Sequence, residues 1–218
     1  MNYFAHALPF LDDPYFIAGT GVPDWLGVVD RRVRVRPKNV EPLVDDPDAV
    51  VAAVARGVRQ HFRDDAVFHR TRAFAETTLE LSAVLRRALA ADAGFRPSLL
   101  AHLLVEVLLD WTLAEDHPGV LEAYYRVLDA VDPAAVQRAV NRMAANKTDR
   151  LAPMIFLFRR ERVLWDYGRD EKLLVRINQV MRRVGFAPLP PEVQELFSPA
   201  RQLVRRRRHE LLEGIPVK

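Results

Sequence analysis

Two segments of the chain each carry three metal-ligand-type side chains spaced four residues apart. They are His61, Asp65 and His69 in the first, and His102, Glu106 and Asp110 in the second. In an α-helix, four residues rotate by about 40° beyond one turn, so each triplet occupies a stripe about 80° wide on one face. Imidazole and carboxylate without thiolate suit Zn, Mn or Fe, and six ligands suggest two ions. We therefore expect two packed helices to bring both triplets to one divalent-metal cluster.

The second triplet lies in LLAHLLVEVLLDWTL, residues 99–113, where the triplet supplies every charged or imidazole side chain. A helix that is apolar nearly all round should be buried. Burying Glu106 and Asp110 without partners would cost several kcal/mol each, so something positive must meet them. We expect a cation held jointly with His102; an ion-pair network with arginines is the alternative.

The first triplet lies in HFRDDAVFHR, which is less apolar and has one side suited to solvent. A surface helix is the alternative for this segment, and it is less favoured because a second triplet with the same spacing occurs in the chain. Two further ligand candidates stand near the N-terminus: His6 among apolar and aromatic residues, and Asp24 in the Gly/Pro-rich AGTGVPDWL. His117 and His209 have no ligand-spaced partner and are expected to be structural or exposed.

Helical periodicity dominates the rest of the chain and predicts one all-α domain over residues 1–218, with the metal site between core helices. Helices are expected at 48–63, 71–91, 97–114, 118–130, 132–145, 148–167 and 170–184, and after 198. Asp132-Pro133 and Ser198-Pro199 combine an N-cap with proline at the first helical position. Weak strand alternation appears only at 31–37, and 19–47 is the longest stretch expected to be irregular.

Composition excludes several classes of protein. Half of the 218 residues are hydrophobic and none is cysteine, which argues against disorder, disulfides and thiolate chemistry. The N-terminus lacks a basic region before its apolar residues, and no apolar run reaches about 18 residues. We therefore expect neither a signal peptide nor a membrane span, and a reducing, cytoplasmic location.

Positive charge collects in the C-terminal part, where residues 141–218 hold 17 Lys+Arg against nine Asp+Glu. The densest run is Arg205–Arg208, which could contact phosphate, nucleic acid or an acidic protein. A solvated helix face is the preferred interpretation. Nucleic-acid binding is not favoured, because no aromatic residues are interleaved with the run.

Several motifs, in order, resemble the acyl carrier protein phosphodiesterase family. They are MNYFAHALPFL, AGTGVPDWLG ending in Asp24, GVRQHFRDDAVFH with its histidine followed by acids, VEVLLDWTL with Glu106 and Asp110, and NRMAANKTDRL. His61 and Asp65 match in kind and spacing. The chain departs from the family pattern at His69, where a carboxylate is usual, at the additional His102, and at Phe62 in place of arginine.

The resemblance implies an all-helical protein distantly similar to the HD phosphohydrolases. That family uses a divalent metal, typically manganese, to hydrolyse the phosphodiester that joins phosphopantetheine to a carrier-protein serine. Zinc-dependent phospholipase C and related nucleases are a second resemblance, because His61/Asp65 and His102/Glu106 also fit their spacing. These departures argue against the acidic carrier protein as the substrate more than they argue against the metal site.

These patterns predict metal-assisted phosphodiester hydrolysis. The expected ligands of one or two ions (Mn, Zn or Fe) are His6, Asp24, His61, Asp65, His69, His102 and Glu106. Asp110 or Asp64 could serve as the general base or as a supporting carboxylate, and Arg63 or Arg70 could clamp the phosphate. The rival interpretation is a non-catalytic metal-stabilised protein that binds partners through its basic C-terminal part.

Overall fold

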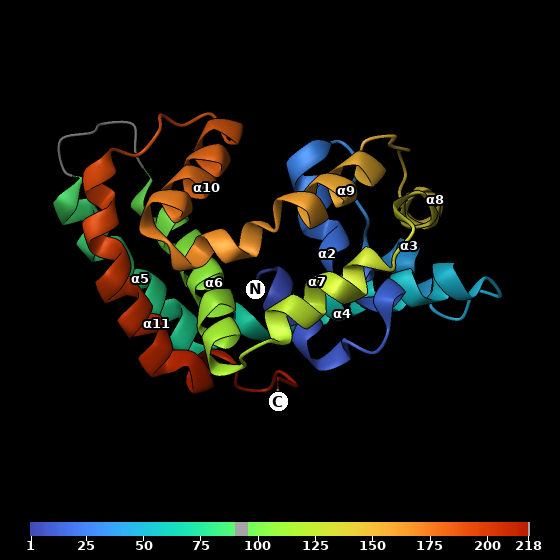
Figure 1. The fold of residues 1–218 in the computed structure, drawn as a ribbon, viewed down its shortest axis with the longest axis horizontal. Helices are drawn as coiled ribbons and strands as arrows, with labels where there is room; N and C mark the ends of the chain where they lie inside the picture. The colour runs from blue at the N-terminus through green and yellow to red at the C-terminus, as the bar shows by residue number, and fades with distance from the viewer. Residues whose placement is uncertain (90–95, 218) are drawn as a thin grey trace. The chain divides into compact units, whose positions relative to one another are not determined.

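Helices are the only regular elements in residues 1–89 and 96–217, the part of the chain that the computed structural model describes. The all-α prediction is confirmed (Figure 1). The strand-like alternation at 31–37 does not give a strand: the segment is irregular to Arg36, and a short helix, α3 (Pro37–Val40), follows. Val33 and Val35 are buried between exposed arginines. The alternating pattern arises because the two valines are buried and the arginines are exposed in a segment that pairs with no strand among the described residues.

The contacts of the chain group it into two compact units. Unit 1 comprises residues 1–2, 67–116 and 163–215, and unit 2 comprises residues 3–66 and 117–162 with the described C-terminal residues 216–217. The helix α4 (Ala49–Phe68) contributes all but its last two residues to unit 2. Each unit is described separately below.

Unit 2 packs its helices around an aromatic core. Besides most of α4, its helices are α1 (Tyr3–Ala7), α2 (Pro14–Val29), α3, α7 (Val120–Asp129), α8 (Pro133–Met143) and α9 (Leu151–Glu161), with 3-10 turns η1 (Leu8–Phe10) and η2 (Glu41–Leu43). Phe4, Trp25, Tyr124, Tyr125 and Phe158 are fully buried and make tilted or edge-on ring contacts. These large side chains hold α1, α2, α7 and α9 together.

Close approach of α2 and α4 corrects the expectation that residues 19–47 are irregular. α2 continues to Val29 in spite of its glycines and of Pro23. A Cβ on Gly57 of α4 would lie 2.0 Å from the carbonyl oxygen of Phe16, and one on Gly19 would lie 2.4 Å from that of Val54. The glycines that read as a loop signal in the sequence therefore serve to let two helix backbones touch.

Unit 1 is built around α6 (Pro97–Asp116). Its other elements are α5 (Arg72–Ala88), η3 (Val163–Gly168), α10 (Asp170–Arg183), η4 (Pro191–Leu196) and α11 (Phe197–Leu211). α5, α6 and α11 pack against one another (Figure 1). By length and composition α6 could cross a membrane, but 56% of its most apolar window is buried inside the protein, as expected for a core helix.

Of the two helix N-caps predicted from an acid or serine before proline, the structure has one. Asp132 caps α8 by accepting a hydrogen bond from Ala134 N at 2.9 Å. The cap predicted at Ser198 is wrong: η4 runs straight into α11, which begins at Phe197 without a side-chain cap. The helix predicted over 148–167 breaks at Arg162, whose φ of 46° is left-handed. The predicted end at Ala91 lies outside the described residues.

Candidate metal centre

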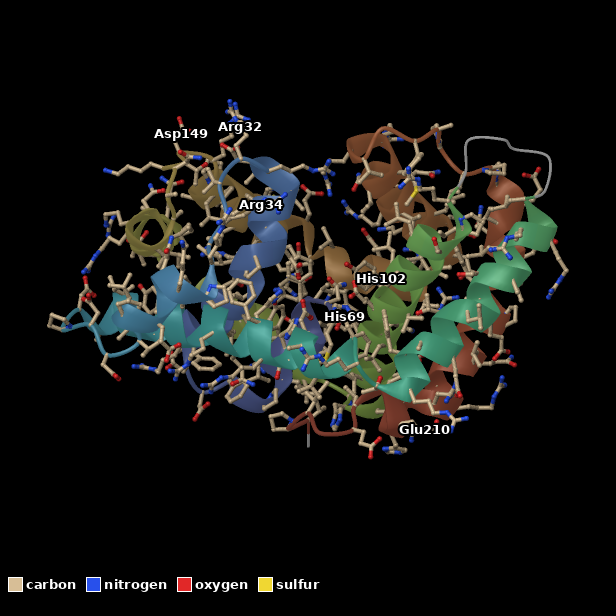
Figure 2. All side chains as sticks on the ribbon, turned by 180° about the vertical axis from the view of Figure 1, so that it is seen from behind. Arg32, Arg34, His69, His102, Asp149 and Glu210 are labelled. Atoms are coloured by element: carbon tan, nitrogen blue, oxygen red, sulfur yellow. The ribbon has the colours of Figure 1, made fainter. Side chains whose placement is uncertain are left out.

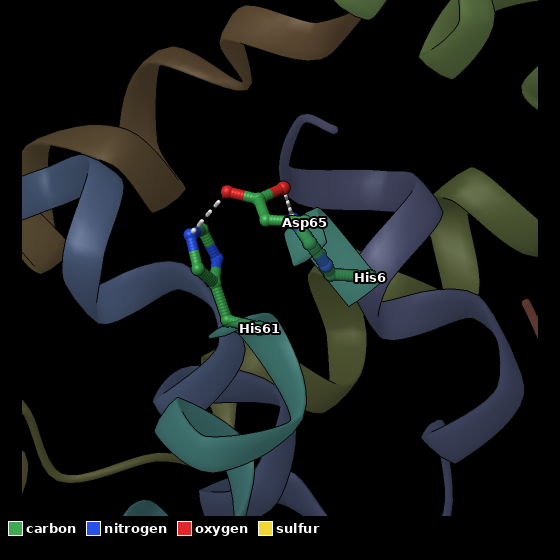
Figure 3. Close-up of side chains that lie close together, drawn as sticks. All are labelled: His6, His61 and Asp65. Atoms are coloured by element: carbon green, nitrogen blue, oxygen red, sulfur yellow. Dashed lines mark ion pairs between the residues drawn. The ribbon is translucent and has the colours of Figure 1, made fainter. Parts of the chain in front are cut away.

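A histidine–histidine–aspartate group lies in unit 2, with ligands from α1 and α4. Nε2 of His6 lies 3.3 Å from Oδ1 of Asp65, and Nε2 of His61, one turn before Asp65, lies 3.3 Å from Oδ2 (Figure 3). The two imidazole rings stack with their centroids 4.2 Å apart. Ligand atoms about 2.1 Å from a tetrahedral ion are about 3.4 Å apart, so these separations suit a shared cation.

In both imidazoles of this group, Nδ1 makes a hydrogen bond to an acceptor other than Asp65. Nδ1 of His61 lies 2.9 Å from the carbonyl oxygen of Thr20 in α2, which can only accept, so Nδ1 donates. Nδ1 of His6 lies 3.0 Å from Oδ2 of Asp64 and donates to it in the same way. In the neutral rings Nε2 is then an acceptor, and Nε2 of His6 makes no hydrogen bond to any described residue.

Four acceptor atoms thus face one another: two Nε2 lone pairs and the two oxygens of Asp65. Each Nε2 atom can meet these oxygens either through a proton or through a cation that Asp65 also binds. One divalent cation among the three side chains satisfies all of them. The chemistry of the donor set therefore fits a metal ion.

Asp64 is the neighbour that orients His6. It is buried, and its second oxygen accepts a hydrogen bond from Nε2 of Gln60 at 2.8 Å. A carboxylate behind a ligating imidazole fixes the ring's tautomer and direction and raises its basicity. Of the two roles that the sequence suggested for Asp64, the geometry matches the supporting carboxylate rather than a base that meets solvent.

The Asp65 side of this group is the side that meets solvent. The side chains of His6 and His61 are 0% and 4% exposed, whereas that of Asp65 is 28% exposed. Burial raises the pKa of Asp65, but the hydrogen bonds that Nε2–H of His6 and of His61 can donate to it lower that pKa more, so the carboxyl stays ionised well below its usual range. A negative, partly open carboxylate is available to a cation and to what the cation binds.

A second group of the same composition lies in unit 1. Nε2 of His69, just after α4, lies 3.0 Å from Oε1 of Glu106, and Nε2 of His102, one turn before Glu106 on α6, lies 3.1 Å from the same oxygen. Figure 2 labels the two histidines. The amino group of Met1 is 3.2 Å from this oxygen as well. Glu106 therefore meets imidazoles and an amine rather than the arginines of the alternative interpretation.

Phe74 packs against the two histidines of the second group, and nearby positive groups keep its carboxylate ionised. The ring of Phe74 packs edge-on against both His69 and His102, with centroids 4.9 and 5.0 Å away. Burial raises the pKa of Glu106, but the Met1 amino group and the two imidazoles outweigh it and hold the pKa below its usual range. Glu106 is therefore an ionised carboxylate between two oriented rings.

The seven predicted ligands thus fall into two three-residue groups, one in each unit, and Asp24. Asp24 lies inside α2, one residue after Pro23, and belongs to neither group. The prediction that the residues of the two groups share one cluster stays a prediction. Asp110 is buried in α6 outside both groups.

The remaining predicted residues lie on the surface or apart from the groups. Arg63 and Arg70 are exposed, and Arg63 follows His61 by two residues, which places it about 200° around α4. His117 precedes α7 and His209 is exposed on α11; neither belongs to a group, as expected.

The Arg205–Arg208 run is an ion-paired face of α11 in unit 1. Arg205 pairs with Glu115, and Arg208 pairs with Asp116 at 2.8 Å. Arg207 pairs with Glu76 at 2.7 Å and with Glu210. This supports the preferred interpretation of the run, a helix face, because acids of the same unit pair with three of its four arginines.

Sequence reasoning missed three supporting groups: the Thr20 carbonyl, Gln60 and Phe74. Gln60 and Asp64 are four residues apart on the helix that carries the first triplet, a spacing that could have suggested their hydrogen bond. The carbonyl of Thr20 and the ring of Phe74 have no such signal, because each belongs to a separate helix.

Searches against protein-family models, curated proteins and solved structures find no significant match to this chain. The resemblance to the acyl carrier protein phosphodiesterases therefore rests on the quoted motifs alone and stays a prediction. The function has to be argued from the geometry of the two groups.

Proposed function

We propose that this protein is a metal-dependent hydrolase of phosphodiester bonds. The observation that carries the proposal is the convergence of two buried imidazole Nε2 atoms on the two oxygens of Asp65, with both Nδ1 atoms committed to acceptors. Three protein ligands with one open side are typical of catalytic rather than structural metal sites. The motif resemblance supports the phosphodiester as substrate.

Each side chain of the group has a distinct task. His6 and His61 hold the metal, and their tautomers are set by Asp64 and by the Thr20 carbonyl. Asp65 supplies negative charge and lies on the accessible side. A bound divalent ion supplies Lewis acidity toward a phosphate oxygen and acidifies water for the attack. The buried ligands exclude water from one side, so substrate reaches the group past Asp65.

Metal content and turnover of bis-p-nitrophenyl phosphate test the proposal together. The variant Asp65→Asn keeps the volume of the side chain and removes its charge, and we expect metal affinity and turnover to fall together by about 10- to 100-fold. Asp45→Asn, at an exposed acid of the same unit, is the matched control and should behave as wild type.

Two outcomes would overturn the proposal. Turnover by wild type that a chelator leaves unchanged would show that no metal takes part. Stoichiometric metal with no turnover would instead support the rival function, a non-catalytic metal-stabilised binding protein.

A further inference from the structure

We propose that His69, His102 and Glu106 bind a divalent transition-metal ion of their own, of the class that prefers imidazole, with Zn²⁺ as its representative. The site lies within unit 1. It does not depend on the hydrolase activity proposed above and stands if unit 2 proves to be non-catalytic.

The three ligand atoms already converge. Both Nε2 atoms approach the same oxygen, Oε1 of Glu106, at 3.0 and 3.1 Å, and the three atoms lie within 4.8 Å of one another. Ligands about 2.1 Å from one ion are about 3.0–3.4 Å apart for octahedral or tetrahedral geometry. A cation can therefore enter with small adjustments of the side chains and displacement of the Met1 amino group, which lies 3.2 Å from the same oxygen.

The group is also held in place before any ion arrives. His102 and Glu106 are one turn apart on α6, the core helix of unit 1, so their spacing is set by the helix. Phe74 of α5 packs against both imidazoles and limits their rotation. Preorganised ligands lose less conformational entropy when they bind, which favours affinity.

The donor set decides the class of metal. Mg²⁺ prefers oxygen ligands and retains water, whereas two imidazoles and one carboxylate suit Zn²⁺, Fe²⁺, Ni²⁺ or Cu²⁺. The side chains of His69 and His102 are 33% and 42% exposed, so the ion reaches the site from solvent and exchanges.

An ion at this site would join the end of α4 to α6. His69 follows Phe68, the last residue of α4. Two residues later, Thr71 caps the N-terminus of α5. A ligand that binds only the folded state stabilises it by mass action. Zn²⁺ should therefore raise the unfolding temperature of the protein, and Mg²⁺ should not.

The test is equilibrium dialysis of chelator-stripped protein against Zn²⁺, followed by elemental analysis. His102→Gln should bind one ion fewer than wild type, or bind it about 10- to 100-fold more weakly. His209→Gln, an exposed histidine of the same unit, is the control and should match wild type. Excess Mg²⁺ should not displace the ion.

Asp65→Asn separates this site from the one in unit 2. It should retain the ion that His102→Gln loses; loss of that ion in Asp65→Asn would show that the residues of unit 1 hold no ion of their own. Equal Zn²⁺ binding by wild type and His102→Gln would likewise overturn the proposal. If His102→Gln fails to fold, Asp65→Asn loaded with Co²⁺ decides, because it lacks the unit 2 site: Zn²⁺ should displace the visible absorption of Co²⁺ and Mg²⁺ should not, and equal displacement by Mg²⁺ would refute the assignment.

Discussion

The contact between α2 and α4 makes Gly57 the most informative position in unit 2. A Cβ at Gly57 would lie 2.0 Å from the carbonyl oxygen of Phe16 and 2.9 Å from Cα of Gly19 and N of Thr20. Since ordinary contact begins at 3.4 Å, Gly57→Ala would have to move backbone by about 1.4 Å. All three neighbours are main-chain atoms, so no side chain can rotate away.

The cost of Gly57→Ala follows from two changes. Overpacking a tight contact typically costs about 1–3 kcal/mol. Separating the helices also lengthens the hydrogen bond from His61 Nδ1 to the Thr20 carbonyl, which contributes about 0.5–1.5 kcal/mol. We expect a loss of about 2–4 kcal/mol in the free energy of unfolding, or about 5–15 °C in Tm for a chain of this size.

Thermal unfolding followed by circular dichroism, with elemental analysis of the same samples, measures this effect. Metal content should fall too, because the Thr20 carbonyl no longer sets the His61 tautomer. Gly27→Ala is the matched control: it lies in α2 with nothing within 4 Å of an added Cβ, and should be neutral or stabilise by up to about 1 kcal/mol. A Gly57→Ala protein as stable as wild type would refute the helix contact.

Three further predictions concern single carboxylates. Asp64→Asn should weaken metal binding about 10- to 100-fold without unfolding the protein, because His6 loses its charged partner; unchanged affinity in a chelator competition would count against it. The Tm of Glu106→Gln should fall less on addition of chelator than that of wild type does, because only the ion of unit 2 is left to remove; a wild type whose Tm does not change with chelator, with a variant that melts lower in both conditions, contradicts this. The backbone N–H of Asp48 and the guanidinium of Arg142 hold the pKa of Asp46 below the usual aspartate value of 3.8. Its stabilisation is thus full above about pH 4 and lost as the pH falls through the lowered pKa. The difference in unfolding free energy between wild type and Asp46→Asn should then shrink from pH 5 to pH 2, and a constant difference would show that Asp46 is not involved.

The sequence by itself determined the helical class and indicated the six residues of the two candidate metal-binding groups. Periodicity and caps are local properties, so α6 and the Asp132 cap of α8 could be predicted from neighbouring residues. The i, i+4 pairs His61/Asp65 and His102/Glu106 follow from helix geometry alone, and the structure keeps each pair on one helix. Glycine misled the prediction at 19–47, because a glycine that permits helix contact and one that permits a turn look alike in sequence.

Only the tertiary structure decided which imidazole joins which carboxylate. His6 meets Asp65 because α1 packs in unit 2, whereas His69, just after the end of α4, faces Glu106 within unit 1. The direction of each ring was decided the same way, by the Thr20 carbonyl, Asp64 and Phe74 from other positions in the fold. Spacing along one helix fixes which side chains share a face, but a ligand set is completed by contacts between helices, and those depend on packing that distant residues determine.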